Sequence, residues 1–288
     1  MAVVRAWGAT RASGLRVLDD RDLPAVHAIL DSDPVANVFV SARVRAAGLN
    51  PARLGAEMWG YTVRRKLVSL CYAGANLVPV CATPDAVRVF ADRARWQGRR
   101  CSSIVGPAEM VEPLWERLEP HWGPARAIRA RQPVMSTTQV PGLAPDPEVR
   151  RVRVDERDIL LPACVAMFTE EVGVSPNGGD GGALYRARVT ELIRGGRAFA
   201  RITDGTVEFK AEIGAITPLA CQVQGVWVPP HLRGQGYSIS GMSAVIATAL
   251  RMFAPVVTLY VNDFNAPARA AYHRVGMADV GAFMSVLF

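Results

Sequence analysis

The most informative segment of the chain reads Val226-Trp227-Val228-Pro229-Pro230-His231-Leu232-Arg233-Gly234-Gln235-Gly236-Tyr237-Ser238. An apolar run ends in two prolines, a basic turn with two glycines follows, and a long stretch of helical period then begins. A strand that leads into a glycine-rich turn at the start of a helix is one way to hold phosphate groups with backbone N–H donors. The turn has neither a Walker A motif nor a full G-x-G-x-x-G, so an ordinary turn after a strand is the alternative.

A second informative segment runs from Asn265 to Gly276, after an expected strand at 256–261. Asn265 is a suitable helix N-cap, and Gly276 stands where helices often end in a glycine. Tyr272 follows Asn265 by seven positions, close to two helical turns, so both side chains lie along one face of the helix. A polar cap and a tyrosine aligned in this way can bind the tail of a cofactor and its reactive end.

These two segments together resemble the GNAT superfamily of acyl-CoA-dependent N-acyltransferases. The signature of that family is R/Q-x-x-G-x-G/A after a strand, followed by a second strand and a helix with N-x6-Y and G-F. The matching residues are Arg233, Gly236 and, with Ser for Gly or Ala, Ser238, then Asn265, Tyr272, Gly276 and, with Met for Phe, Met277. The resemblance is strong over about residues 150–288. Over its whole length the chain looks like actinobacterial tandem-GNAT proteins whose N-terminal copy has lost the cofactor motif.

The resemblance implies that the C-terminal half binds acetyl-CoA or another acyl-CoA. Backbone amides of the turn would hold the CoA pyrophosphate, the strand before it would pair with the pantetheine amides, and the helix cap would bind further along that arm. The residues at these positions are Val226, Trp227, Val228, Arg233, Gly234, Gln235, Gly236, Tyr237, Ser238, Ile239 and Asn265. Tyr272 would donate a proton to the departing thiolate, which needs only modest help because a thiol has a pKa of about 8.5. The reaction needs no metal.

The acceptor amine needs more help, because an ammonium group with a pKa of about 10.4 is mostly protonated at neutral pH. A general base or a desolvating pocket must therefore act on it. In the expected strand 207–216, alternation places Lys210 and Glu212 on the face opposite three apolar side chains. Glu212 is our first candidate for the base, directly or through water. The alternative is a solvated strand face that carries a Lys–Glu pair.

Three more residues are candidates for the acceptor side of the site. Tyr260 stands where Nα-acetylating relatives often have a Glu, so their mechanism does not transfer directly, and Tyr260 can instead line the acceptor pocket. Glu170 and Glu171 end an expected helix just before the glycine-rich loop 177–182. They can attract a cationic amine, and a solvated helix end is the alternative interpretation.

Composition restricts the partners and the compartment. The chain has 288 residues, half of them hydrophobic, and a net charge of +7, which suits an anionic partner. No basic run carries interleaved aromatic residues, so we expect no nucleic-acid partner. The five cysteines stand singly, which indicates reduced thiols and no metal site. Neither a signal peptide nor an apolar span of about 18 residues occurs, so we expect a cytoplasmic protein without membrane contact.

The order of expected elements repeats along the chain, because each half reads β-α-α-β-β-β-α-β-α-β. A hairpin at 280–288 is expected to end the second half. Residues 140–148 contain three prolines and a glycine, which predicts a stiff, extended linker. We therefore predict an α+β protein with two tandem GNAT-like domains, each a mixed, mostly antiparallel sheet flanked by helices. A flexible tail at 1–14 precedes a degenerate domain at 15–139, and the linker leads to a catalytic domain at 149–288.

The two halves differ at the turn that would carry the chemistry. The first half has Ala82-Thr83-Pro84-Asp85 there, which lacks a glycine and carries an acidic residue that opposes a pyrophosphate. The sequence thus predicts one active site per chain, which transfers an acyl group, with acetyl expected, to a primary amine of a small metabolite or a protein. The rival functions are a non-enzymatic acyl-CoA sensor and aminoacyl transfer from aminoacyl-tRNA. The acceptor and the oligomeric state are left open.

Overall fold

A computed structural model of the chain describes residues 13–178 and 181–288. The predicted tail at 1–14 lies almost wholly outside the described residues, as does the middle of the loop 177–182. The chain divides into two compact units. Unit 1 contains the described residues up to Asp33, Arg43–Ala130 and Met284–Phe288, and unit 2 contains Pro34–Ala42 and Arg131–Phe283.

The helices and strands follow the same order in both halves of the chain. The first half contains β1 (Gly14–Val17), the 3₁₀ turn η1 (Asp20–Asp22), α1 (Leu23–Leu30), α2 (Val38–Ala47), α3 (Pro51–Leu54), β2 (Glu57–Val63), β3 (Lys66–Ala73), β4 (Asn76–Val80), α4 (Pro84–Gln97), β5 (Ser103–Pro107), α5 (Ala108–Trp122) and β6 (Ala127–Thr137). The second half contains β7 (Arg150–Arg151), η2 (Val154–Glu156), α6 (Arg157–Val172), α7 (Ala183–Arg194), β8 (Ala198–Thr203), β9 (Thr206–Ile216), β10 (Cys221–Trp227), η3 (Pro230–Leu232), α8 (Tyr237–Met252), β11 (Val257–Tyr260), α9 (Ala266–Arg274) and β12 (Ala278–Leu287). Apart from the short α3 and the 3₁₀ turns, the predicted order of elements is therefore present twice.

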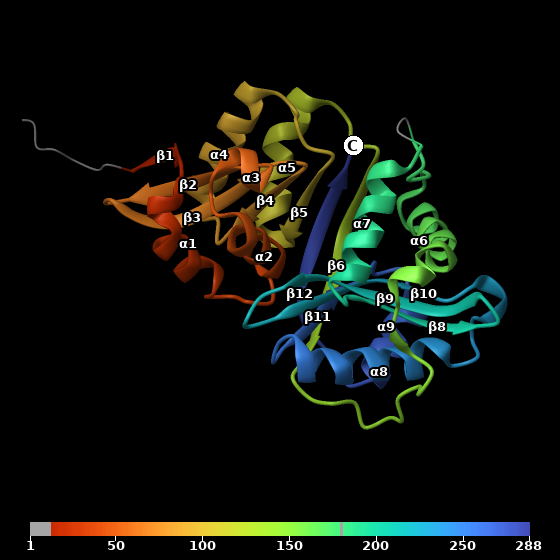
Figure 1. The fold of residues 1–288 in the computed structure, drawn as a ribbon. Coiled ribbons are helices and arrows are strands. Elements are labelled where there is room, and N and C mark those ends of the chain that lie inside the picture. The colour runs from red at the N-terminus through yellow and green to blue at the C-terminus, as the bar shows by residue number, and fades with distance from the viewer. Residues whose placement is uncertain (1–12, 179–180) are drawn as a thin grey trace, which may run out of the picture. The chain divides into compact units, whose positions relative to one another are not determined.

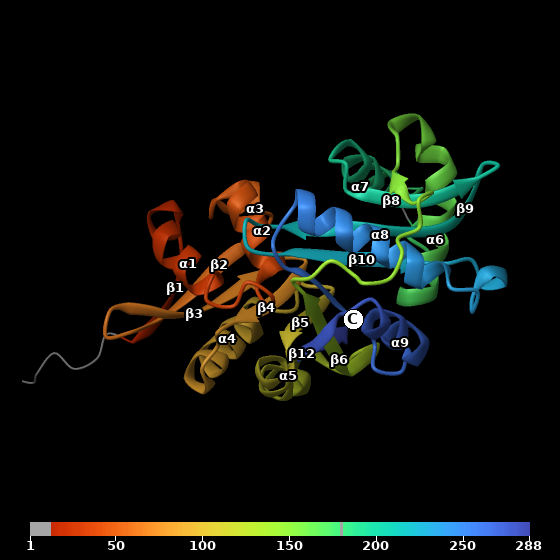
Figure 2. The same ribbon diagram turned by 90° about the horizontal axis from the view of Figure 1, so that it is seen from below.

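Unit 1 is a sheet with helices on both faces. Its strands run in the order β1-β2-β3-β4-β5, and neighbours are antiparallel except for the parallel pair β4–β5. The helices α4 and α5 cover one face of this sheet and α1 the other (Figures 1 and 2). Trp59, Phe90 and Leu114 are buried where α4 and α5 pack on the strands.

Unit 2 has the same layered construction. Its strands run in the order β6-β11-β10-β9-β8-β7, and the neighbours are antiparallel except for β10–β11. The helices α6 and α7 cover one face and α8 and α9 the other (Figure 1). Phe209, Ala211 and Ile213 of β9 pack in the core that contains α8. The predicted α+β fold with a mixed, mostly antiparallel sheet flanked by helices is confirmed.

The division between the units differs from the predicted boundary at residues 139–149. Because Val134–Thr137 of β6 pairs with Val257–Tyr260 of β11, the last strand of the first half belongs to unit 2. The end of the chain belongs to unit 1, where the Phe288 N–H donates to the carbonyl of Ser102 at 3.1 Å. Each unit is thus completed by residues from the other half of the chain.

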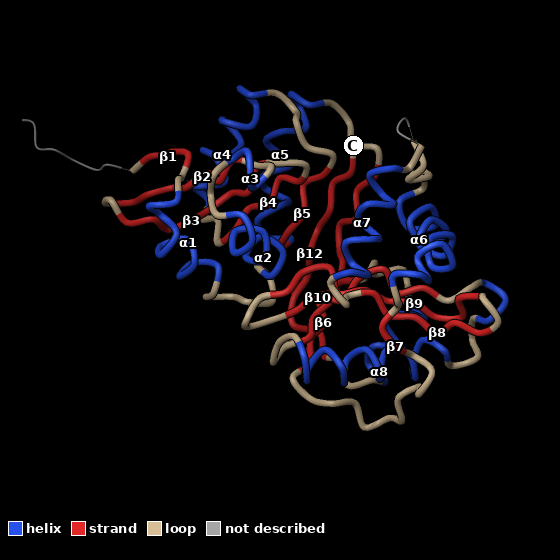
Figure 3. The backbone as a smooth tube through the Cα atoms, viewed as in Figure 1, coloured by secondary structure: helices blue, strands red, loops and turns tan. Residues whose placement is uncertain are grey.

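The proline-rich stretch 140–148 is anchored within unit 2. The Ser243 hydroxyl of α8 donates to the carbonyl of Leu143 at 2.6 Å. The buried Asp146 carboxylate accepts from Arg201 at 2.9 Å, and its N–H donates to the carbonyl of Ser240. Figure 3 shows this stretch as a loop beside α8. It is extended as predicted, but these contacts tie it along a helix instead of leaving it as a spacer.

The hairpin predicted at 280–288 is wrong, because Ala278–Leu287 forms one continuous strand, β12. Tight hairpin turns need a positive φ, and Gly281 does not adopt one. Met284 and Val286 are instead buried in the core of unit 1. Within the described residues, no helix is long and apolar enough to span a membrane.

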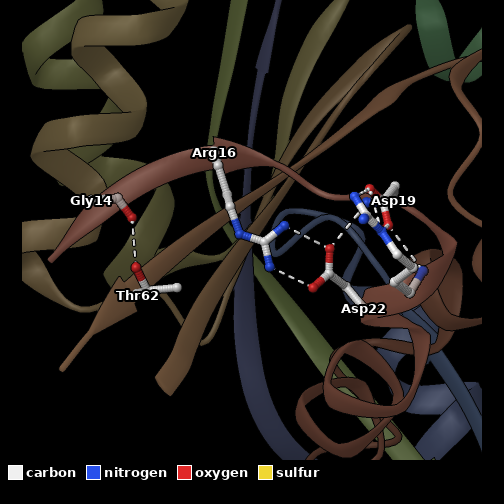
Figure 4. Close-up of polar contacts among 6 residues, drawn as sticks. Gly14, Arg16, Asp19, Asp22 and Thr62 are labelled. Atoms are coloured by element: carbon white, nitrogen blue, oxygen red, sulfur yellow. Dashed lines mark hydrogen bonds and ion pairs between the residues drawn. The ribbon is translucent and has the colours of Figure 1, made fainter. Parts of the chain in front are cut away.

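Near the start of each half of the chain, an arginine side chain and a backbone N–H both donate hydrogen bonds to one carboxylate. In unit 1 the Arg16 guanidinium donates two hydrogen bonds to Asp22, six positions later, and the Asp19 N–H donates to the same carboxylate at 3.1 Å (Figure 4). These contacts fix the passage from β1 through η1 into α1. The hydrogen bond of Thr62 to the carbonyl of Gly14 ties the same strand to β2.

The same hydrogen-bond arrangement recurs with the same residue spacing in unit 2. The Arg150 guanidinium donates to Glu156 at 2.6 and 2.8 Å, and the Arg153 N–H donates to this carboxylate at 2.8 Å. The arginine, the backbone donor and the acid are again separated by three positions each. This shared geometry supports a duplicated structural unit, as the repeated order of elements suggests.

Candidate functional site

The turn between β10 and α8 has an open, glycine-dependent backbone. Gly234 has a φ of +79° and Gly236 a φ of +90°, values that residues with a Cβ rarely adopt. A Cβ at either position would meet no protein atom within 4 Å, so the outer side of the turn is unobstructed. Gly236 is also the N-cap of the 16-residue helix α8, which no side chain caps.

Five consecutive N–H groups in this turn, those of residues 234–238, donate to no acceptor within the described part of the chain. The next two donors, Ile239 and Ser240, are occupied, because both bond to the carbonyl of Gly236 at 2.9 and 3.2 Å. Ile239, which we predicted to contribute a binding amide, thus has its N–H bonded within the chain. The five free donors and the positive end of the α8 dipole form a cradle for an anion.

The predicted residues Arg233 and Glu170 form an ion pair beside this cradle. The Arg233 guanidinium donates to Glu170 at 2.6 Å and to the carbonyl of Val228 at 3.0 Å. The indole of Trp227 donates to the other oxygen of Glu170 at 3.2 Å. Glu170 is thus engaged with the turn and with β10, and the ion pair offsets the negative charge we expected it to offer an amine. Gln235 and Tyr237 also support the turn, through a hydrogen bond to the carbonyl of His231 and by packing against the core.

The strand before the turn separates from its neighbour. β10 pairs with the parallel strand β11 at Cys221 and Gln222, and within the described residues the pairing does not continue beyond them. The edge of β10 that faces β11 is therefore available further along, where Val226 is half-buried. An extended ligand with amide groups can add to such an edge as a strand would. The predicted residue Val228 is buried and lies just beyond β10.

Asn265 lies at the start of α9 and Tyr272 lies near its end. The Asn265 side chain accepts the N–H of Ala268 at 3.2 Å, which confirms it as the N-cap. The Tyr272 side chain is buried, and its hydroxyl has no hydrogen-bond partner among the described residues. Burial raises the pKa of Tyr272, and the negative charge of Glu171 raises it further. Its hydroxyl therefore keeps its proton at neutral pH and can donate it.

Glu212 and Lys210 lie on the face opposite the apolar side chains of β9, as predicted. The alternative of a solvated face is wrong, because Lys210 is 1% and Glu212 9% exposed. The Lys210 ammonium lies 3.7 Å from one Glu212 oxygen, and the Gln224 amide donates to the other at 2.9 Å. Glu212 is thus a buried, well-held carboxylate that can accept a proton.

β10 has a bulge next to Lys210 and Glu212. The pairing of β10 with β9 shifts between Gln224 and Trp227, and Gly225 has a φ of +62°. The Lys210 ammonium donates to the carbonyl of Gly225 at 2.9 Å. A Cβ at Gly225 would lie 3.1 Å from both the Lys210 nitrogen and the Glu212 carboxyl carbon. Only a glycine fits this position without displacing a neighbour.

Tyr185 of α7 was not among the predicted site residues. Its hydroxyl donates to the carbonyl of Cys164 at 2.9 Å. Burial is the main cause that raises the pKa of Tyr185, and charge at Cys164, Glu212 and Glu171 raises it further. Tyr185 therefore shares the neighbourhood of two predicted acidic residues. The sequence feature that could have indicated Tyr185 is its position three residues after the loop 177–182.

Tyr260, by contrast, ends β11 and lies apart from β9 in the strand order. Its side chain is 38% exposed, and its ring centroid lies 5.3 Å from that of Phe283. Nothing in this geometry assigns it a contact with an acceptor. Across residues 13–178 and 181–288, no three His, Cys, Asp or Glu side chains gather as metal ligands would.

Comparison with known families and curated proteins names no activity. Residues 56–160 match the model of a family described as a domain of unknown function, DUF4081. No curated protein matches the chain.

Comparison with solved structures identifies the fold. A GCN5-related N-acetyltransferase from Sphaerobacter thermophilus is 16% identical, with a TM-score of 0.60 over 95% of this chain and 94% of that one. A GNAT-family acetyltransferase from Colwellia psychrerythraea is 14% identical, with a TM-score of 0.56 over 96% and 99%. A tandem GNAT protein from the clavulanic acid biosynthesis pathway is 15% identical, with a TM-score of 0.54 over 96% and 98%. The chain has the GNAT fold that its sequence resemblance implies.

Proposed function

We propose that unit 2 binds acetyl-CoA and transfers its acetyl group to a primary amine. The observation that carries this proposal is the row of five unpartnered N–H groups from Gly234 to Ser238 at the start of α8. Such a row suits the pyrophosphate of CoA, and the open edge of β10 suits its amide-containing arm. The GNAT fold supports acyl transfer as the class of reaction.

The buried acid–base groups of unit 2 suit direct attack of the amine on the thioester. The amine nitrogen forms a bond to the acyl carbon while the bond from that carbon to sulfur breaks. Glu212, held by Gln224, accepts the proton that the amine loses, directly or through water. Tyr272, whose pKa is raised by burial, gives its proton to the departing thiolate. The products are an N-acetylamine and CoA.

The turn is tested by titrating acetyl-CoA into the Gly236→Asp variant by calorimetry. A carboxylate within the cradle repels the pyrophosphate, so we expect the affinity to fall at least a hundredfold. Gly205→Asp is the matched control, since Gly205 also has a positive φ of +72°, with no protein atom within 4 Å of a Cβ. Unchanged affinity of Gly236→Asp, or an equal loss in both variants, would contradict the assignment of the turn.

The reaction is tested by mixing the protein with acetyl-CoA and a library of amines while measuring free thiol. We expect amine-dependent release of CoA with at least one acceptor and, in the same mixture, an acetylated amine by mass spectrometry. Binding of acetyl-CoA without thiol release for any amine would favour the sensor function instead. The library should include small metabolites and peptides with free N-termini or lysines, because both classes of primary amine were expected.

A further inference from the structure

A basic groove of about 750 Å³, here called the α7 groove, lies along exposed residues of α7 that have no part in the proposed acetyl transfer. Four of its nine lining residues are arginines and one is an acid, while the other four are small: the charged ones are Arg157, Arg186, Arg194, Arg197 and Glu191. Lysine and arginine make up only 33 of the 288 residues of the chain. Basic side chains are therefore concentrated at this groove.

Two of these arginines are unpaired. Arg186 and Arg194 are exposed, and neither side chain forms a hydrogen bond or an ion pair with any described residue. They lie eight positions apart on α7, which is about 12 Å along the helix axis. The helix dipole favours Arg194 in the last turn of α7 but disfavours Arg186 in the first turn, so the stability of the helix does not explain Arg186.

The other two arginines of the α7 groove already hold carboxylates of this chain. The Arg157 guanidinium donates two hydrogen bonds to Asp158, at 2.9 and 3.2 Å. The Arg197 guanidinium donates to Glu191 at 2.8 Å. A guanidinium matches a carboxylate well because its N–H donors form a planar fork. The two unpaired arginines offer the same chemistry to carboxylates from another molecule.

We propose that the α7 groove is a docking surface for an acidic segment of a partner protein, whose carboxylates pair with Arg186 and Arg194. Charges spread over about 12 Å suit an extended acidic chain better than a single phosphate, which needs donors that converge on one point. The described lining residues include no aromatic side chain on which nucleic-acid bases stack and no large apolar side chain that enters a membrane. Docking there does not depend on acetyl transfer, so each proposal can fail without the other.

The surface is tested with a fluorescent peptide of eight glutamates, which is titrated with the full chain at low salt while anisotropy is measured. Arg186→Gln/Arg194→Gln should weaken binding about five- to twentyfold, as for the loss of two exposed charge pairs. Arg251→Gln/Arg274→Gln is the matched control and should change the affinity less than twofold. Arg251 and Arg274 also lie in the last turns of helices of unit 2, and their exposed side chains have no hydrogen bond or ion pair to a described residue.

Glu191→Gln should act in the opposite direction and tighten peptide binding about two- to fivefold. It removes the negative charge that lines the α7 groove and releases Arg197 for an external carboxylate. Raising the salt concentration should weaken peptide binding to every folded variant, since exposed charges are screened. Circular dichroism establishes that each variant is folded.

Saturating CoA should leave the affinity of the wild type for the peptide within twofold, because the glycine turn and the α7 groove share no residue. Displacement of the peptide by CoA, an equal loss in the two double variants, or no saturable binding to the wild type would overturn the proposal. Inorganic triphosphate, oligothymidine and vesicles of anionic lipid serve as rival anions. If any of them bound as tightly, with the same dependence on Arg186 and Arg194, the occupant would not be an acidic protein segment. Failure of the wild type to bind CoA would overturn only the proposed function, since the peptide titration needs no CoA.

Discussion

The Arg233 guanidinium donates a 2.6 Å hydrogen bond to the Glu170 carboxylate, which links the glycine turn before α8 to the end of α6. Both side chains are nearly half exposed, so the pair contributes less than about 1 kcal/mol to the free energy of unfolding. The charge of Glu170 matters more for ligand binding, because this carboxylate lies beside a cradle for an anion. Glu170 thus weakens the attraction of the turn for a phosphate, because it offsets the positive charge of Arg233.

Glu170→Gln should therefore tighten the binding of CoA by about two- to threefold at low salt, since the substitution removes one nearby negative charge. The gain should shrink as salt screens the charges. Calorimetric titration of CoA at two salt concentrations measures it. Glu191→Gln is the matched control, because the exposed Glu191 of α7 also pairs with two arginines, at 2.8 and 3.1 Å, and these arginines are partly buried. Weaker binding in Glu170→Gln would show that the ion pair serves to shape the turn.

Tyr272→Phe should lower the rate of thiol release about ten- to a hundredfold with an acceptor amine, because the thiolate then leaves without a proton donor. The affinity for acetyl-CoA should change less than twofold. An unchanged rate would show that the thiolate leaves unaided.

The raised pKa of Tyr272 also predicts an alkaline effect on stability. The folded state favours the protonated phenol, so its contribution is full below the unfolded pKa of about 10 and is lost as the pH rises above it. Denaturant unfolding at pH 8 and pH 11 should show a smaller loss in Tyr272→Phe than in the wild type. Equal losses would mean that this phenol ionises freely in the folded protein.

Local signals in the sequence predicted the parts of the site that depend on neighbours along the chain. The cap at Asn265 and the two glycines of the turn follow from backbone rules that operate within a few residues. Alternation likewise placed Glu212 on the correct face of β9. It could not show what covers that face, which α6 and α7 supply from elsewhere in the chain.

The features that the sequence did not predict all depend on distant partners. The end of the chain joins the core of unit 1 through Val286, and no local pattern marks this destination. The loop around Asp146 resembles a linker in composition, yet its carboxylate pairs with Arg201, far along the chain. Gly225 looks like an ordinary glycine until the register of β9 and β10 reveals the bulge.

The arginine–carboxylate contact near the start of each half predicts a contribution to stability that is lost in acid. Arg150 beside Glu156 lowers the pKa of that carboxyl to about 2, and Arg16 lowers the pKa of Asp22 in the same way. The folded state favours the ionised carboxylate, so the contribution is present above the unfolded pKa of about 4.3 and is lost as the pH falls toward 2.

Glu156→Gln should accordingly destabilise the protein at pH 7, and its deficit relative to the wild type should shrink between pH 4.5 and pH 2. Chemical unfolding across this range gives the difference. Asp22→Asn tests the equivalent contact in unit 1 and should behave alike. A deficit that does not depend on pH would mean that the side chain acts through packing and not through its charge.

Gly225→Ala should disturb the bulge of β10 more than its small added volume suggests. The new methyl group meets the Lys210 nitrogen and the Glu212 carboxyl carbon at 3.1 Å, and the φ of +62° is strained for any residue with a Cβ. We expect a loss of about 1–3 kcal/mol in the free energy of unfolding. Gly281→Ala is the control, because Gly281 lies in a strand of the same unit without a positive φ and with open space around it. An equal loss of stability in both variants would show that the bulge places no special demand on this position.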